Sequence, residues 1–404
     1  MLKKIIALCA LQLITLLTFA SEQTIAQKKS ASQQIEKLKE HIPVPELQKI
    51  VLNYIGNEYI PTKLDENKRI VKAALSQNGE YLVSLSTDSK AYYHSEETAK
   101  IWKFENGKYK LTHAFDIPMM VQNVALSNDG AYIAFQINSD EVHIWQLKNN
   151  TYAENQIEKG LIFDSEASLQ FFGNSKMLGR ATNDSVQVWK LSDTLKKFVL
   201  QRNFNTYHHV ASVAFSSDGK YIAGGTRSGN INLWEPDNSK PFMSLETRAS
   251  DPVDPRVKVT ISPDSNQLAA YRSSVELFKM KNNRLEPFQI IEPDNNVDMV
   301  KFSPDNNHLA IIIPDPSRSW KPKINVWKMN PKSLKYENKS AIIGDRMDLI
   351  GFAPNNSIIT LNVNTPHNKE LIVWENQKEL LEQDADEKIK SAAEQEQPVV
   401  TEVD

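Results

Sequence analysis

Two clusters in the sequence carry side chains that could do chemistry. His208 and His209 could offer imidazoles to a metal ion, but a doublet without carboxylate partners favours a structural or surface role. Asp384, Asp386 and Glu387 lack the Gly and the terminal Glu of a calcium loop, which is typical of solvated charge. No H-E-x-x-H, P-loop, G-x-G-x-x-G or G-x-S-x-G motif occurs. The sequence therefore predicts no catalytic residue, no metal site and no cofactor.

The composition is that of a globular protein without an excess of positive charge. The 404 residues include 47 Lys and Arg against 50 Asp and Glu, for a formal net charge of −3, so we expect no nucleic-acid partner. Hydrophobic residues make up 40% of the chain, which is enough for a packed core. The single cysteine, Cys9, excludes a disulfide framework and a Cys-based zinc or iron–sulfur site.

The first twenty residues have the features of an export signal. Lys3 and Lys4 precede the largely apolar residues 5–19, and the small residues Thr18 and Ala20 suit cleavage before Ser21. The apolar stretch is shorter than the roughly 20 residues that cross a bilayer. We expect a signal peptide at residues 1–20, a periplasmic or secreted protein, and no membrane span in the mature chain. An uncleaved anchor is the alternative.

A segment of about 44 residues recurs seven times between residues 70 and 374. The clearest copy, residues 210–235, reads as an apolar strand, a Ser-x-Asp-Gly turn, a second strand, a short turn and a third strand that ends in Trp. Asp and Asn bond their own backbone two residues on, and Gly tolerates positive φ, which favours tight hairpins. The third strand carries an aromatic residue in every copy: Trp102, Trp145, Trp189, Trp234, Phe278, Trp327 and Trp374.

These repeats resemble those of WD-repeat β-propellers. The resemblance implies an all-β fold, a seven-bladed β-propeller of WD-repeat type, with the repeated aromatics in the blade cores. No copy has the family's Gly-His pair or an Asp after the Trp, so its buried hydrogen-bond network is incomplete and apolar packing should hold the blades. The Tol-system periplasmic propeller shares the turn, but it carries an α/β domain for which about 50 residues leave no room.

We divide the chain into four parts. Residues 1–20 are the signal peptide, 21–56 a linker with a short amphipathic helix, 57–375 the propeller, and 376–404 an acidic helical or disordered tail. The tail is a poor strand because it is rich in Glu, Gln, Lys and Ala. The outer strand of the last blade should therefore come from residues 57–64, where Pro61 suits an edge strand.

The short N-terminal helix presents one apolar face, formed by Leu47, Ile50, Val51 and Tyr54. Residues 41–55 resemble the opening of an F-box, with Pro43 and Pro45 ahead of an acidic residue and an apolar helix. An F-box ahead of WD repeats implies a substrate receptor for a ubiquitin ligase, here one delivered into a host cell. The alternative that we favour is a helix that caps the side of the propeller.

Long connections between the second and third strands of a blade are the places where a partner could bind. They are expected at residues 87–98, 314–323 and 362–370, in blades one, six and seven, with residues 248–256 on the same face. Aromatic and Arg side chains dominate binding hot spots. The candidate partner-binding residues, which we call the loop crescent, are Tyr92, Tyr93, His94, Arg318, Trp320, Lys321, Lys323 and His367.

The sequence thus predicts an exported, monomeric and non-enzymatic platform that binds another protein. The ubiquitin-ligase receptor is one alternative. The other is an enzyme or small-ligand binder with its site at the mouth of the central channel, which clustered carboxylates or histidines in the channel lining would favour.

Overall fold

The computed structural model describes residues 59–64, 69–87, 97–118, 120–137, 141–159, 168–181, 185–205, 210–238, 240–248, 255–314, 322–343, 347–365 and 368–376. Every regular element in these ranges is a β-strand. No helix found there is long and apolar enough to span a membrane. The expected signal peptide, the helix face at Leu47–Tyr54 with its F-box-like stretch, and residues 377–404 of the tail lie outside the described residues.

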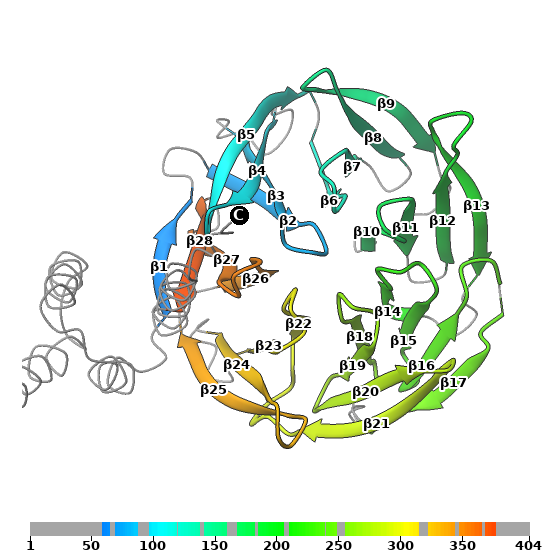
Figure 1. Ribbon diagram of the computed structural model, residues 1–404, viewed down its shortest axis with the longest axis vertical. Coiled ribbons are helices and arrows are strands. Elements are labelled where there is room, and N and C mark those ends of the chain that lie inside the picture. Colours follow the sequence, from blue (N-terminus) through cyan, green and yellow to red (C-terminus); the bar gives the residue numbers. More distant parts are fainter. Residues whose placement is uncertain are drawn as a thin grey trace, which may run out of the picture. The chain divides into compact units, whose positions relative to one another are not determined.

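The strands form four-stranded antiparallel blades arranged in a ring (Figure 1). The first three blades contain β2 (Arg69–Leu75), β3 (Tyr81–Thr87), β4 (Glu97–Glu105) and β5 (Lys108–Ile117); β6 (Asn123–Leu126), β7 (Tyr132–Gln136), β8 (Glu141–Lys148) and β9 (Thr151–Lys159); and β10 (Ser168–Phe172), β11 (Met177–Ala181), β12 (Ser185–Leu191) and β13 (Phe198–Asn205). Blades four to six contain β14 (Val210–Phe215), β15 (Ile222–Thr226), β16 (Asn230–Trp234) and β17 (Met243–Glu246); β18 (Lys258–Ile261), β19 (Gln267–Tyr271), β20 (Val275–Lys281) and β21 (Arg284–Ile291); and β22 (Met299–Phe302), β23 (His308–Ile313), β24 (Lys323–Asn330) and β25 (Lys335–Ile343).

The seventh blade takes its strands from both ends of the described chain. It contains β26 (Met347–Phe352), β27 (Ile358–Thr365) and β28 (Asn368–Asn376), and β1 (Tyr59–Lys63) pairs with β28. The Leu64 N–H donates to the Leu371 carbonyl over 3.1 Å, and Lys63 Nζ lies 2.8 Å from Glu370 Oε1. The ring of the propeller is therefore closed by a strand that precedes blade one in the sequence.

A repeated side-chain turn follows the first strand of most blades. In blade four, Ser216 Oγ donates to Asp218 Oδ1 over 2.8 Å, and Asp218 Oδ1 accepts the Lys220 N–H over 3.1 Å. Gly219 adopts a φ of +76°, and the Tyr221 N–H donates to Ser216 Oγ. These bonds fix the hairpin locally, because Asx and Ser side chains satisfy backbone donors that the turn leaves free. The same pairing links Ser76 to Asn78, Ser127 to Asp129, Ser262 to Asp264 and Ser303 to Asp305.

These turns also join neighbouring blades at one face of the ring. The backbone N–H of a turn residue donates to a side-chain oxygen of the next turn, as in Asn128 to Ser175 Oγ over 2.9 Å. The equivalent bonds run from Asn78 to Asn128, from Asp218 to Ser265 and from Asp264 to Asn306. We call the side of the ring that carries these turns the turn face.

Apolar side chains fill the space between adjacent blades. Of the seven repeated aromatics of the third strands, four are buried: Trp102, Trp189, Trp234 and Phe278. The other three are partly buried: Trp145, Trp327 and Trp374. The Trp102 Nε1–H donates to Ser84 Oγ over 3.0 Å, and that of Trp374 donates to Thr360 Oγ1 over 2.8 Å. Blades one and seven thus contain a hydrogen bond from the Trp side chain to a hydroxyl group of the second strand. Apolar packing holds each blade against the next.

Candidate interaction face and central channel

The order of strands separates the connections of each blade onto two faces. Since each blade is an antiparallel meander, the turns between first and second and between third and fourth strands share the turn face. The connections between second and third strands, and those between blades, emerge on the opposite side, which we call the loop face. Blades one and seven are adjacent on the ring, because β2 pairs with β28 through Ile70 and Lys369.

The loop crescent belongs to the loop face. The connection in blade one leaves β3 at Thr87 and enters β4 at Glu97, and that in blade six leaves β23 at Ile313 and enters β24 at Lys323. Lys323 pairs with Ile313 and Ile343 and is partly buried. The other crescent residues, Tyr92, Tyr93, His94, Arg318, Trp320, Lys321 and His367, lie outside the described residues.

The expected long connection in blade seven is wrong. Residues 362–370 are mostly strand: β27 continues to Thr365, β28 begins at Asn368, and Asn362 pairs with Glu370. These residues are rich in Asn and Thr, which is typical of loops. In the structure their backbone groups pair between β27 and β28, and the register of this pairing shifts between Val363 and Thr365. Two residues separate the end of β27 at Thr365 from the start of β28 at Asn368, so a connection as long as 362–370 does not occur in blade seven.

A buried carboxyl lies at the base of the blade-one connection. Glu97 is 3% exposed, accepts a hydrogen bond from the Val121 backbone, and has Oε2 without a partner. Burial raises the pKa of Glu97 to about 7, although the Val121 N–H and the charge of Lys72 act to lower it. Burial also lowers the pKa of Lys72, and the nearby charge of Lys369 adds to this effect. Glu97 is not among the residues predicted from the sequence. The signal that could have identified it is the alternation of Glu97, Ala99 and Ile101, which places all three on one buried face of β4.

This burial should make the stability of the protein fall as the pH rises. A carboxyl whose pKa is higher in the folded than in the unfolded state stabilises the fold below pH 4.5, and this contribution is lost as the pH rises to about 7. We expect the wild type to lose on the order of 2 kcal/mol from this group over that range, and Glu97→Gln to lose much less. Urea denaturation at pH 4.5, 6 and 7.5 measures the difference. Parallel pH profiles for the two proteins would contradict the assignment.

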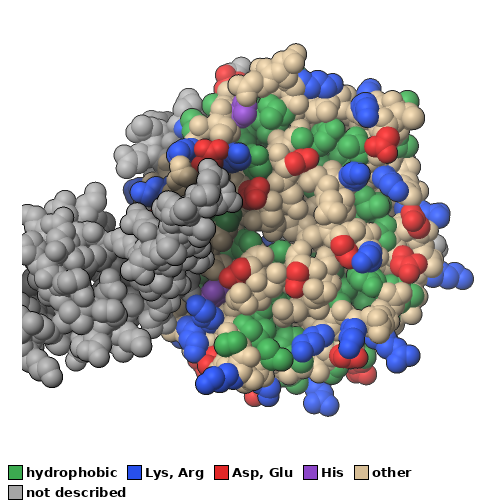
Figure 2. All heavy atoms as spheres, viewed as in Figure 1, with side chains coloured by type: hydrophobic (Ala, Val, Ile, Leu, Met, Phe, Trp, Pro, Cys, Tyr) green, Lys and Arg blue, Asp and Glu red, His purple; other side chains and the backbone are tan. Residues whose placement is uncertain are grey.

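The central channel holds a cavity of about 550 Å³ lined by the first strands of all seven blades. Figure 2 shows one face of the molecule, with a hollow at the centre of the ring and charges of both signs intermingled around it. The lining combines apolar side chains with polar ones, and its charged residues are Lys301 and Asp348. Burial raises the pKa of Asp348, as does the charge of Asp298, while Lys369 acts to lower it. No histidine is among the residues that line this cavity.

Among the described residues that line the cavity, Asp348 is the one carboxylate, so no cluster of carboxylates or histidines is present there. Across the described residues, no group of three or more His, Cys, Asp and Glu side chains could hold a metal ion. A histidine lies close to two carboxylates in blade two, where His143 Nδ1 is 2.8 Å from Glu154 Oε2 and Nε2 is 3.5 Å from Glu141 Oε2. This histidine is buried in blade two, away from the channel lining.

Comparison with known proteins agrees with this architecture. Residues 200–235, the end of blade three and most of blade four, match the WD domain, G-beta repeat family. The crystal structure of the Cps50 (Swd1) β-propeller domain of Myceliophteria thermophila covers 78% of this chain and 99% of that domain with a TM-score of 0.57 at 11% sequence identity. The chain is a β-propeller of the WD-repeat type.

Curated relatives match this chain at low identity. The human U3 small nucleolar RNA-associated protein 18 homolog is 24% identical over 60% of this chain and 43% of its own length. Transducin beta-like protein 2 of Mus musculus is 23% identical over 56% of this chain and 55% of its own length. The chain thus spans about half the length of these relatives.

Proposed function

We propose that the protein is a non-enzymatic platform whose loop face binds another protein across blades six, seven and one. The observation that carries the proposal is the position of the connections 88–96 and 314–322. The strands that flank them, β3 and β4 in blade one and β23 and β24 in blade six, belong to blades on either side of blade seven, and these strand ends lie on the loop face. Loops on a rigid repeat scaffold commonly carry binding function, and these contain Tyr92, Tyr93, Arg318 and Trp320.

We also propose that the protein works outside the cytoplasm. Lys3, Lys4, the apolar residues 5–19 and the small residues Thr18 and Ala20 support export by a signal peptide to the periplasm or beyond the cell. We propose that the exported chain works as a monomer, with no nucleic-acid partner. The near balance of acidic and basic residues in the sequence supports the last point.

Affinity capture with full-length variants tests the binding surface. We expect Trp320→Ala, or Tyr92→Ala with Tyr93→Ala, to weaken capture of the wild-type partner about tenfold or more, as for hot-spot aromatics. Phe242→Ala is the matched control, because Phe242 is an exposed aromatic in the β16–β17 connection on the turn face. Capture that survives both loop-face changes and is lost with Phe242→Ala would refute the proposal. Thermal melting confirms that each variant is folded.

A further inference from the structure

One level of the channel wall can be compared across all blades. This level is formed by the residue two places before the turn that joins the first and second strands of each blade. In every blade this residue makes the second backbone pair, counted from that turn, with the second strand. All seven line the cavity: Ala74, Ala125, Phe171, Ala214, Thr260, Lys301 and Gly351. Four are Ala or Gly, and Lys301 is the one charged member of this level.

The ammonium group of Lys301 has no counter-ion. Lys301 makes no hydrogen bond or ion pair to any residue that the structure describes, and burial lowers its pKa. The nearby carboxylates face other cations, since Asp298 Oδ1 lies 3.1 Å from Lys258 Nζ and Asp348 Oδ2 lies 4.0 Å from Lys369 Nζ. Lys301 is partly buried, and an anion beside its ammonium group would stabilise the charged form through a charge-assisted hydrogen bond.

The same cavity contains a buried hydrogen-bond acceptor without a partner. Gln77 belongs to blade one, and its Nε2 donates to the Phe215 carbonyl of blade four over 3.1 Å. Gln170 Nε2 donates to the same carbonyl over 3.2 Å. Gln77 Oε1 is buried and unpartnered. The wall therefore combines an unpaired donor, Lys301, an unpaired acceptor, Gln77 Oε1, and the apolar side chains of Phe171 and Phe302.

We propose that the central channel binds a small organic acid. Its carboxylate pairs with Lys301, its apolar body lies against the channel wall, and an N–H or O–H group on it donates to Gln77 Oε1. A cavity of about 550 Å³ suits a small molecule of this kind. This site contains no residue of the loop crescent, so the test of the channel proposal is independent of the test of the protein-binding proposal.

Calorimetric titration of the full-length protein with three acids tests the channel site. The acids are 4-hydroxyphenylacetate, hexanoate and pyruvate, and 4-hydroxyphenylacetamide is the neutral analogue of the first. We expect at least one acid to bind, and 4-hydroxyphenylacetate to bind about tenfold or more tightly than its amide, because a charge-assisted hydrogen bond is lost. Mass spectrometry of molecules released from the denatured protein provides a second readout, in which we expect an organic acid.

Variants separate the role of Lys301 from a general effect of charge. Lys301→Met should weaken binding of the acid about tenfold or more, and Lys301→Arg should retain it. Lys258→Met is the matched control, since Lys258 lies on β18 outside the cavity lining, and it should bind as the wild type does. Failure of all three acids to bind together with no acid released, or equal binding by the wild type and Lys301→Met, would overturn the proposal. Thermal melting shows whether Lys301→Met is folded.

Discussion

Replacing Gly225 by Ala is expected to lower the free energy of unfolding by about 3 kcal/mol or more. Gly225 lies in β15, and a Cβ there would overlap the backbone carbonyl oxygen of Val257, which leads into blade five. The Val257 N–H donates to the Thr226 carbonyl over 3.0 Å, so the two backbones are already tied together. Relief of the overlap would separate blades four and five. Urea denaturation followed by tryptophan fluorescence measures the loss.

Gly107→Ala is the matched control for this change. Gly107 has a φ of +77°, but a Cβ at this position would have no neighbour within 4 Å. Its replacement should therefore cost only the backbone strain, about 1 kcal/mol. If both variants lose the same free energy of unfolding, a clash with the backbone of Val257 does not explain the need for glycine at position 225.

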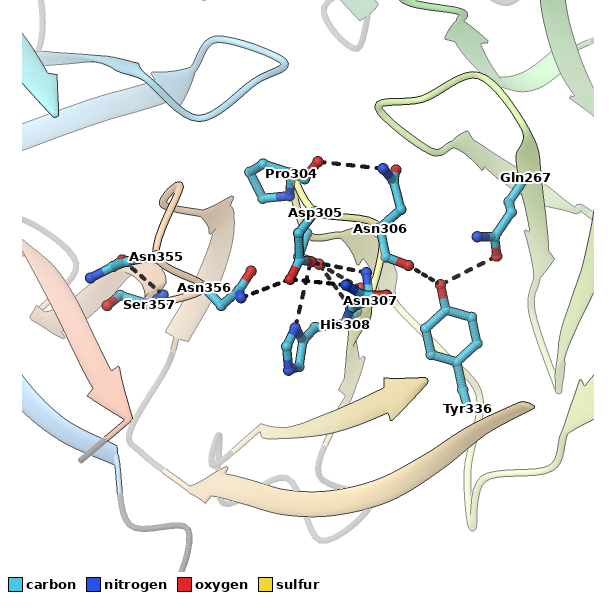
Figure 3. A network of polar contacts seen from close by, with 11 residues as sticks. Gln267, Pro304, Asp305, Asn306, Asn307, His308, Tyr336, Asn355, Asn356 and Ser357 are labelled. Atoms are coloured by element: carbon cyan, nitrogen blue, oxygen red, sulfur yellow. Dashed lines mark hydrogen bonds and ion pairs between the residues drawn. The ribbon is translucent and has the colours of Figure 1, made fainter. Parts of the chain in front are cut away.

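The second large effect is expected at the joint between blades six and seven. The Asp305 carboxylate accepts hydrogen bonds from Ser303, from the Asn307 N–H over 2.9 Å and from Asn356 Nδ2 over 2.9 Å (Figure 3). His308 Nδ1 lies 3.6 Å from the same carboxylate. Asp305→Ala removes all of these contacts and should cost about 3 kcal/mol, because hydrogen bonds to a charged group are among the strongest.

The hydrogen bonds of Asp305 also determine how the stability of the protein changes at low pH. Burial alone would raise its pKa, but the bonds from His308, Ser303, Asn307 and Asn356 outweigh burial and hold the pKa well below its usual range. A carboxyl with a depressed pKa stabilises the fold above its ordinary pKa, near 4, and this contribution is lost as the pH falls further. The wild type should therefore lose stability below about pH 4 more steeply than Asp305→Ala does.

Asp264→Ala provides the comparison for the blade joint. Asp264 accepts the same turn bonds from Ser262 and Asn266, but its carboxylate makes no side-chain bond to a neighbouring blade among the described residues. Its loss should cost about 1 kcal/mol. If Asp264→Ala proves as destabilising as Asp305→Ala, the turn itself rather than the blade joint is what Asp305 stabilises.

The blades could be predicted from the sequence because their signals are local. The Ser216-x-Asp218-Gly219 turn is stabilised by its own side chains, and the aromatic in each third strand recurs at a nearly constant interval. The pairing of β1 with β28 could be anticipated because the sequence after Trp374 is a poor strand. In each case a few neighbouring residues determine the structure.

The parts that the sequence analysis missed depend on contacts between distant residues. Pairing across β27 and β28 turns the Asn- and Thr-rich residues 362–370 into a hairpin, which composition alone does not indicate. The pKa of Glu97 depends on its burial, on a hydrogen bond from the Val121 backbone and on the charge of Lys72, and both of these residues lie outside β4. Lys301 could have been found by aligning the seven repeats, since it replaces a small or uncharged residue at one level of the channel.

Hydrogen–deuterium exchange of the full-length protein, with and without its captured partner, tests most directly that the loop face is the binding surface. The account predicts that the partner protects peptides covering residues 88–96 and 314–322 on blades one and six, and leaves exchange in residues 216–221 and 237–243 on the turn face unchanged. Protection confined to the turn-face peptides would contradict it.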